Sequence, residues 1–557
     1  GWITKALSKL KKGNRHSTLL KIAGRLIKDK CTESEIIALL APHAKGCDFP
    51  QEELEKLVRS VYEQYSSGGG ARQGKAEKIV ALLEEDLMVF HDQREDAYAA
   101  ISKGPKPRVI KIRSAQFRKL ISKLVWNKLG ETTSRATLDD VTSVLEGKAN
   151  DGALFNLELR VAWHDEAIYY DLGHGRAVKV TAEGWDVVQA PILFRQHGHQ
   201  KQQVVPIKGG DLKQLLRFVN LPQEDGNNVG LLFLAWVVTS LIPGFPHPVL
   251  VAHGSGGSAK STLFRVIKEL LDPSSVRTLA PTERHDEFVL QAEMHWFLPI
   301  DNLSHLSGWM SDAISRACTG EGSQKRQLFT DSDVVIYSFQ RVIGLNGVNL
   351  VVDKPDLLDR SLLLALERVP DHKRMEETEF WRQFDEAKPA ILGGLFDVLS
   401  QAIKRHPAVS MKALPRMADF TRWGVAVTES LGHEAEDFLH AYKQVIATQN
   451  REAIQASPVA LAIEMLMKTR TEGWTGTASN LLDELNAVAS ELHIDIRSKA
   501  WPKDPSRLGR RIKVVQTNLE DAGIIIRWEK NKQRIITIKT NDSAVSTVAT
   551  DIGSEAP

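Results

Sequence analysis

The sequence predicts a multidomain α/β protein with a helical N-terminal domain, an α/β core and a C-terminal winged helix. Three observations predict this fold class. A chain of 557 residues is too long for one hydrophobic core. A buried strand, a Gly-rich loop and an amphipathic helix follow one another over residues 248–271. Near the C-terminus, a basic helical run precedes two strand-like runs.

Composition and charge narrow the class of protein. The chain is 42% hydrophobic and 25% charged, as soluble globular proteins are. A net charge of +2 requires any nucleic-acid binding to come from local patches. No apolar run reaches the roughly 18 residues of a membrane span, and the three isolated cysteines fit a reducing compartment. We therefore expect a cytoplasmic protein without membrane contact.

The pattern along the chain divides it into segments. Apolar stripes such as Leu19, Ile22 and Leu26 predict helices, Ser66–Gly70 reads as a linker, and short β-forming runs at Leu157–Val161 and Ala167–Asp171 predict strands. We expect residues 75–150 to be helical. The predicted organisation is a helical domain over 1–65, a linker over 66–74, a helical and small β region over 75–209, the α/β core over 210–375, a helical connector over 376–455, the winged helix over 456–540, and a disordered tail over 541–557.

The loop in the core has the layout of a phosphate-binding loop. In such a loop, backbone N–H groups and a helix N-terminus surround the phosphates. Lys260 would neutralise phosphate oxygens, and the Ser261 hydroxyl would bind Mg²⁺. A Gly-Ser loop that only resembles one is the alternative. The predicted nucleotide-binding residues are Gly254, Gly256, Gly257, Ser258, Ala259, Lys260, Ser261 and Thr262.

Residues further along complete a nucleotide site. A hydrophobic strand ends at Asp301 and Asn302, where an acid would join the Mg²⁺ shell. A second strand ends at Asn346, which could orient the attacking water, and Arg360 follows in a place that suits an arginine finger. Each residue alone is weak evidence, because strand-terminal Asp and surface Arg are common. Their order after the loop predicts an ATP and Mg²⁺ site.

With these motifs, residues 75–450 resemble the AAA+ ATPases of the superfamily 3 helicase type, in particular the helicase parts of phage and mobile-element primase–helicases. Residues 13–65 resemble the primase C-terminal domain that follows a primase–polymerase core. The resemblance implies a ring, expected to be a hexamer, with Lys260, Ser261, Asp301 and Asn346 facing Arg360 of the next subunit. Because the chain begins with Gly1, we expect it to be part of a longer polypeptide that can carry an upstream primase–polymerase domain.

Two positions depart from the usual pattern. Ala259 stands where the motif has glycine, which costs about 1 kcal/mol if its φ is positive. Asn302 cannot abstract a proton, so the general base is unassigned. Glu283 is a weak candidate for it.

Two basic segments are candidates for DNA contact. Residues 320–340 predict a hairpin in which Lys325 and Arg326 could pair with phosphates and Phe329 could stack on a base. An ordinary hairpin with a solvated basic edge would look the same. In the C-terminal domain the candidates are Arg507, Arg510, Arg511, Lys513 and Lys532, with solvated surface charge as the alternative.

The sequence therefore predicts an ATPase and DNA helicase that moves along single-stranded DNA. Double-stranded DNA is a second expected partner, through the winged helix. One alternative is a non-motor initiator or loader that binds a replication origin, with Ala259 and Asn302 marking a decayed site. Another is a defence or signalling ATPase that uses oligomerisation as a switch, whose ATPase activity would depend little on DNA.

Overall fold

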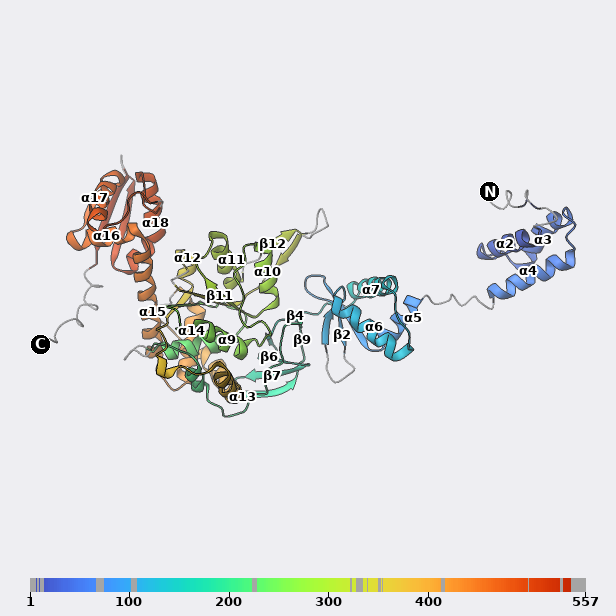
Figure 1. Cartoon of the computed structure of the whole chain (residues 1–557), viewed down its shortest axis with the longest axis horizontal. Coiled ribbons are helices and arrows are strands. Elements are labelled where there is room, and N and C mark those ends of the chain that lie inside the picture. Colours follow the sequence, from blue (N-terminus) through green and yellow to red (C-terminus); the bar gives the residue numbers. More distant parts are fainter. Residues whose placement is uncertain are drawn as a thin grey trace. The chain divides into compact units, whose positions relative to one another are not determined.

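The computed structural model describes residues 7, 10, 15–66, 75–101, 108–222, 228–320, 323–326, 334–337, 339–348, 352, 354–411, 416–498, 500–530 and 534–541. The chain forms two compact units, many of whose helices and strands are labelled in Figure 1. The first contains residues 1–91, 97–102 and 110–153, and the second contains the rest. Each unit is described by itself. None of the described helices is both long and apolar enough to cross a membrane.

The first unit begins with the predicted helical domain. Its helices are α2 (Arg15–Lys28), α3 (Glu33–Lys45) and α4 (Gln51–Ser66). Thr32 caps the start of α3, because its hydroxyl accepts the Glu35 N–H while the Glu35 carboxylate accepts the Thr32 N–H. Buried leucine, isoleucine and valine side chains from all three helices form one core, including Leu19, Ile22, Leu40, Leu54 and Val58.

The rest of the first unit differs from the expected all-helical segment. A three-stranded sheet in the order β1–β2–β3 packs with three helices. The central strand was missed because Ala97–Ile101 is a buried alanine-rich run without period-two alternation, and the strands beside it have only 5 and 4 residues. The elements are α5 (Lys75–Glu84), β1 (Leu87–His91), β2 (Ala97–Ile101), β3 (Arg108–Lys111), α6 (Ala115–Leu129) and α7 (Arg135–Asn150).

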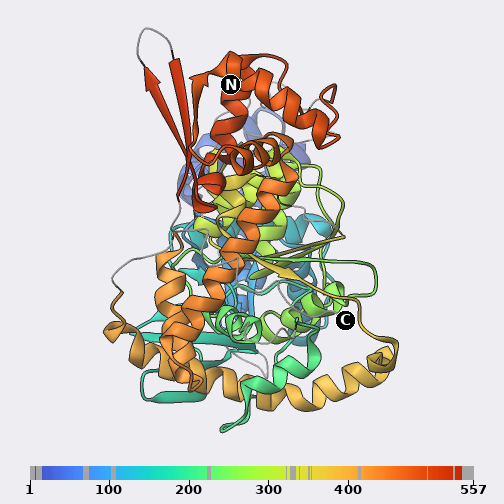
Figure 2. The ribbon, with the colours of Figure 1, turned by 90° about the vertical axis from the view of Figure 1, so that its left-hand side faces the viewer.

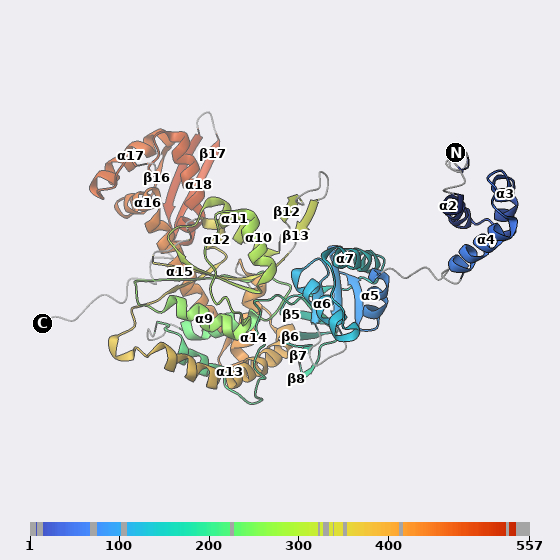
Figure 3. The same ribbon diagram turned by 45° about the vertical axis from the view of Figure 1, so that its right-hand side comes forward.

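The second unit opens with the predicted small β region. Four of its strands, β5 to β8, form an antiparallel sheet in which they lie in sequence order (Figure 3). The expected strand at Leu157–Val161 is interrupted, because Arg160 has a φ of +62°. The elements are β4 (Leu157–Glu158), β5 (Val161–His164), β6 (Ala167–Gly173), β7 (Arg176–Thr181), β8 (Gly184–Gln189) and β9 (Leu193–Phe194), with β4 paired to β9.

A four-stranded parallel sheet lies at the centre of the second unit, in the order β11–β14–β10–β15. Strand β14 therefore separates the strand before the Gly-rich loop from the strand that carries Asp301. The elements of this region are a 3₁₀ helix η1 (Leu212–Phe218), α8 (Val229–Thr239), β10 (Val249–His253), α9 (Lys260–Leu271), α10 (His285–Met294), β11 (Phe297–Leu303), α11 (Gly308–Thr319), β12 (Ser323–Arg326), β13 (Val334–Tyr337), β14 (Val342–Gly347), α12 (Pro355–Leu358) and β15 (Ser361–Ala365).

A buried ionic cluster fixes the far end of α9 to β11. Asp272, which caps the C-terminus of α9, accepts the N–H groups of Trp296 and Phe297 at 2.9 and 3.3 Å. Lys268 donates to the Asp272 carboxylate at 2.6 Å, and Arg160 donates to it at 3.1 Å. Burial raises the pKa of Asp272, but the two cations outweigh it, and the net pKa lies below its usual value. The helix that carries Lys260 and the strand that carries Asp301 are thus held together.

Helices complete the second unit, as predicted for residues 376–450. They are α13 (Glu377–Arg405), which packs on β7 and β8, then α14 (Ala418–Ser430) and α15 (Ala435–Ala456), with short 3₁₀ turns η2 (Asp371–Lys373) and η3 (His406–Ala408). Helix α15 joins two regions. The Gln449 side chain donates to the Ser361 carbonyl, while Asn450 donates to Asp521 at 3.2 Å and accepts from Asn518 at 3.0 Å.

The C-terminal module has its own core and an antiparallel sheet in the order β16–β18–β17. The expected helix and two strands are present, and Figure 2 shows β17 and β18 as a two-stranded ribbon beside the helices. The elements are α16 (Pro458–Thr469), β16 (Trp474–Thr477), α17 (Ala478–Glu491), α18 (Pro505–Asp521), β17 (Ile524–Lys530) and β18 (Arg534–Thr540).

Candidate functional site

The Gly-rich loop between β10 and α9 adopts left-handed backbone at three positions. Gly254, Gly257 and Ala259 have φ values of +144°, +80° and +64°. Gly254 cannot carry a side chain, because a Cβ there would lie 2.1 Å from the Leu366 carbonyl oxygen. Gly256 faces open space, and Ser258 is buried. Ala259 thus occupies a conformation that suits glycine, at a cost of about 1 kcal/mol.

Lys260 folds back across this loop. Its Nζ donates to the Gly254 carbonyl at 2.7 Å, the Ser255 carbonyl at 3.0 Å and the Ser258 Oγ at 3.1 Å. Burial lowers the pKa of Lys260, and the Asp301 carboxylate opposes that shift. The ammonium group therefore lies inside the loop that a phosphate chain would enter.

The first turn of α9 is free of the groups that usually cap a helix. Its N-cap residue is Ala259, no side chain accepts a hydrogen bond there, and the first turn contains no acid. The N–H groups of Lys260, Ser261 and Thr262 lie in that turn and have no intrahelical acceptor. A helix N-terminus of this kind attracts an anion.

Adjacent strands bring the predicted acid and amides to the same edge. The Ser261 hydroxyl donates to Asp301 Oδ1 at 3.0 Å. Asn302 has a φ of +61°, and its N–H donates to Asn346 Oδ1 at 2.9 Å. Asn346 is buried, and its Nδ2 donates to no group among the described residues. A buried amide of this kind has a hydrogen bond to give to a ligand or a water.

Arg360 lies at the opposite end of the sheet. The Arg360 carbonyl accepts the Val249 N–H at the start of β10, whereas the loop follows His253 at its end. At roughly 3.3 Å per residue, Arg360 is about 20 Å from Leu366, which abuts the loop. Asp356 binds the Arg360 guanidinium, and Arg416 binds Asp356 at 2.8 Å. Arg360 therefore does not join the loop of its own chain.

Glu283 is separate from the loop residues. Leu279 runs parallel to Ile300 on β11, so Glu283 follows at the loop-bearing edge of the sheet. It lines a cavity of about 370 Å³ with side chains from α10 and α11, namely His285, Trp309, Asp312 and Arg316. The described contacts do not connect it to Lys260 or Asp301. Its role as general base stays a prediction.

Sequence reasoning missed the segment that follows β15. Asn220 Nδ2 donates to the Ser258 carbonyl at 3.2 Å and the Glu367 carbonyl at 2.8 Å, which ties this segment to the loop. Arg368 and Arg374 lie beside Gly257. No local sequence signal marks this segment, because it reaches the loop only through the parallel pairing of β15 with β10, which brings the carboxyl ends of both strands to one edge of the sheet.

The predicted hairpin before β14 is present. Strands β12 and β13 pair antiparallel, with Lys325 opposite Val335 and Arg326 opposite Val334. Figure 3 shows the two strands standing away from the four-stranded sheet. Phe329 lies outside the described residues, and DNA contact by this hairpin stays a prediction.

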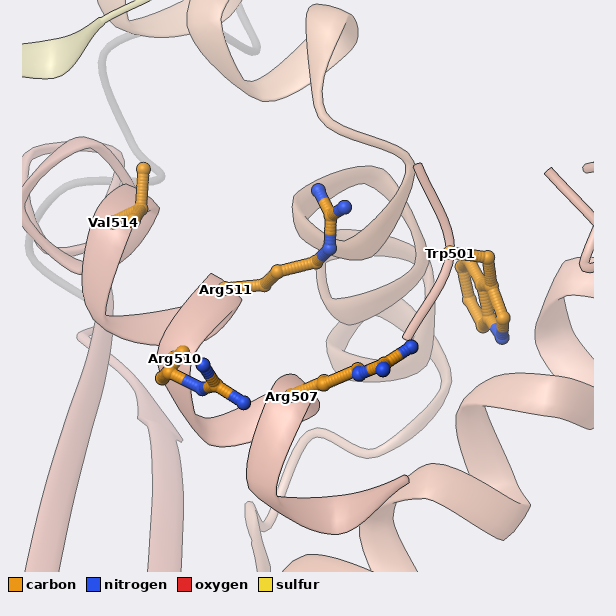
Figure 4. A pocket seen from close by; sticks show the side chains of 5 residues that line it. All are labelled: Trp501, Arg507, Arg510, Arg511 and Val514. Atoms are coloured by element: carbon orange, nitrogen blue, oxygen red, sulfur yellow. The ribbon is translucent and has the colours of Figure 1, made fainter. Parts of the chain in front are cut away.

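The basic face of α18 is the second candidate surface. Arg507, Arg510, Arg511 and Lys513 are exposed, while Leu508, Ile512, Val515 and Leu519 of the same helix are buried. The three arginines line an open cavity of about 360 Å³ with Trp501 and Val514 (Figure 4). Lys513 instead lies over the Trp528 ring at 5.8 Å, and Lys532 is outside the described residues. Arginines on one helix face can pair with phosphates.

Three parts of the chain match known families. Residues 4–66 match primase C terminal 1. Residues 212–450 match the actinomycete integrative conjugative element replication protein, AICE RepA, and residues 459–550 match the AICE RepA C-terminal domain. No curated protein matches the chain.

Solved structures give only distant similarity. The apo C-terminal region of NrS-1 is 13% identical, with a TM-score of 0.39, over 83% of this chain and 98% of that one. Cdc6p from Pyrobaculum aerophilum is 14% identical, with a TM-score of 0.17, over 59% and 95%. These scores do not establish a shared fold. The family matches confirm the resemblance drawn from the sequence: this chain is similar to the primase–helicase replication proteins of mobile elements.

Proposed function

We propose that this chain is the ATP-driven helicase segment of a mobile-element replication protein, and that it moves along single-stranded DNA as a ring with an AAA+ core. One observation carries the proposal. Lys260, Ser261, Asp301 and Asn346 converge at one edge of the parallel sheet, from the loop and two neighbouring strands. The AICE RepA match over the same region supports a role in replication.

The residues present fit a nucleotide and Mg²⁺. The uncapped start of α9 and the buried Asn346 amide supply donors that no group in the described part of the chain accepts. Ser261 and Asp301 provide the oxygen ligands that Mg²⁺ prefers, and the ion would neutralise phosphate charge when bound. Lys260 would leave the loop carbonyls and bind phosphate oxygens. Asn346 would orient the attacking water, with its other amide atom fixed by Asn302.

Arg360 fits a role at a neighbouring subunit. Its position opposite the loop rules out phosphate contact in its own chain. A guanidinium presented at the far end of the sheet suits a finger that completes the next subunit's site. A hexamer is the expected ring.

The decisive experiment measures ATP hydrolysis with and without single-stranded DNA, and unwinding of a forked duplex. Wild-type protein should hydrolyse ATP faster with DNA present, and Lys260→Ala should lose both activities. Exposed Lys213 is the matched control, and Lys213→Ala should keep both. Full unwinding by Lys260→Ala would overturn the motor proposal.

The basic face of α18 favours a second candidate, an origin-binding initiator or loader without motor activity. Arg507, Arg510 and Arg511 offer a duplex a cationic helix face, and Ala259 strains the nucleotide loop. This candidate predicts sequence-dependent duplex binding and ATP binding without DNA-stimulated hydrolysis. The same ATPase assay separates the two.

A further inference from the structure

The backbone after β15 packs directly on the phosphate loop. Leu366 donates its N–H to the His253 carbonyl at 2.8 Å, and Val369 donates to the Gly257 carbonyl at 3.1 Å. Asn220 bridges the Ser258 and Glu367 carbonyls from the other side. This segment therefore has a fixed position against the part of the loop that would surround phosphate.

Two arginines of that segment reach the tip of the loop. A Cβ placed at Gly257 would lie 3.8 Å from an Nη of Arg374 and 3.9 Å from Cγ and Nε of Arg368. Both arginines are exposed. Arg374 pairs with Asp371 at 3.0 Å, but that carboxylate is 85% exposed, so the pair is weak and can open.

The loop alone carries too little positive charge to balance a nucleoside triphosphate, and these two arginines could supply more. Lys260 is the one charged residue between Gly254 and Thr262. A bound nucleoside triphosphate brings several negative charges, and an arginine guanidinium can bind two phosphate oxygens at once. We propose that Arg368, assisted by Arg374, binds phosphate oxygens of the nucleotide held by the loop of the same chain.

This inference rests on the proposed nucleotide site and adds cations in cis to it. The arginines near the sheet then have two different roles. Arg368 and Arg374 act at their own chain's loop, whereas Arg360 lies at the far end of β15 and binds Asp356. The competing account is that Arg368 is a solvated surface residue and Arg374 only pairs with Asp371.

The test is equilibrium binding of a fluorescent, non-hydrolysable ATP analogue and of fluorescent ADP, both with Mg²⁺. Arg368→Ala should weaken binding of the ATP analogue about 10-fold or more, as expected for lost charge-assisted hydrogen bonds. Arg374→Ala should weaken it less, because Asp371 competes for that side chain. Arg368→Lys should recover only part of the affinity, since it keeps the charge but loses the planar fork.

The matched control is Lys373→Ala, which removes one exposed positive charge from the same segment. Its affinity should stay within about twofold of wild type, by the screening expected for an exposed charge. Equal affinities for Arg368→Ala and Lys373→Ala overturn the inference and leave the nucleotide site intact. A wild-type protein that binds neither nucleotide overturns the proposed function as well.

Discussion

The hydroxyl of Ser261 and the carboxylate of Asp301 are joined by a 3.0 Å hydrogen bond, although 40 positions separate them in the chain. The bond links the first turn of α9 to β11, and the hydrogen bonds of Lys268 and Asp272 to Phe297 link the other end of α9 to the start of β11. Because both elements are fixed, the two oxygens that we propose as Mg²⁺ ligands are preorganised for the ion.

Asp301→Asn should therefore separate nucleotide binding from metal use. The amide keeps the shape and the hydrogen bond to Ser261 but loses the negative charge that attracts Mg²⁺. We expect ATP hydrolysis to fall by about 100-fold or more, on the scale of losing preorganised electrostatic stabilisation. Nucleotide affinity measured in EDTA should stay near that of wild type. Asp312→Asn, at an exposed position of α11, is the control, and equal Mg²⁺ dependence in both variants would contradict the assignment.

Arg360 should act across a subunit boundary. Lys260→Ala and Arg360→Ala proteins should each be inactive in ATP hydrolysis. Mixed in one preparation, they should regain part of the activity, because some interfaces then pair an intact loop with an intact finger. A mixture as inactive as its parts would argue that Arg360 serves another role, such as holding Asp356 and Arg416 in place.

Ala259→Gly should stabilise the loop. The φ of +64° penalises alanine, so glycine should raise the free energy of unfolding of the core by about 1 kcal/mol. Urea unfolding followed by tryptophan fluorescence measures the change. Ala447→Gly is the control and should lower the free energy of unfolding, since this exposed residue lies within α15, where glycine costs about 1 kcal/mol. A loss of stability in Ala259→Gly would show that the loop tolerates alanine without strain.

The basic face of α18 should contribute to DNA affinity through phosphate contacts. Arg510→Ala should weaken binding to all sequences alike and reduce the salt slope, the change in log affinity with log salt, by about 1. Lys468→Ala on α16, whose side chain pairs with Glu464, is the control. An unchanged salt slope in Arg510→Ala would assign this face to solvent.

Acid should destabilise the core through buried histidines. The pKa of an unfolded histidine is about 6.5. In the folded protein, burial lowers the pKa of His247 to about 3 and the pKa of His197 to about 4. Between these values the unfolded chain takes up protons that the folded chain refuses, so stability is lost as the pH falls below 6.5. His247→Phe should reduce the slope of unfolding free energy between pH 6 and 5 by up to about 1.4 kcal/mol per pH unit. Urea titrations at each pH provide the measurement, and an unchanged slope would contradict a neutral buried His247.

The sequence predicted the site better than the surroundings that hold it. A glycine loop before Lys260 and polar residues after apolar runs are local signals, so the sequence alone could name Asp301 and Asn346 as candidates. Arg368 could not, because its relevance depends on β15 pairing with β10, a contact between distant segments. The central strand β2 was missed because its alanine-rich run lacks a clear period, and tertiary packing decided its conformation.

Helix α15 couples β15 to α18 mechanically. Gln449 holds the beginning of β15, next to Arg360, and Asn450 holds the end of α18. Gln449 and Asn450 are consecutive residues of one helix, so the same rigid element makes both contacts. If a neighbouring subunit displaced Arg360, α15 would move with β15. This movement would also displace α18, unless one of these hydrogen bonds broke. The ring interface and the basic helix would then share one moving part.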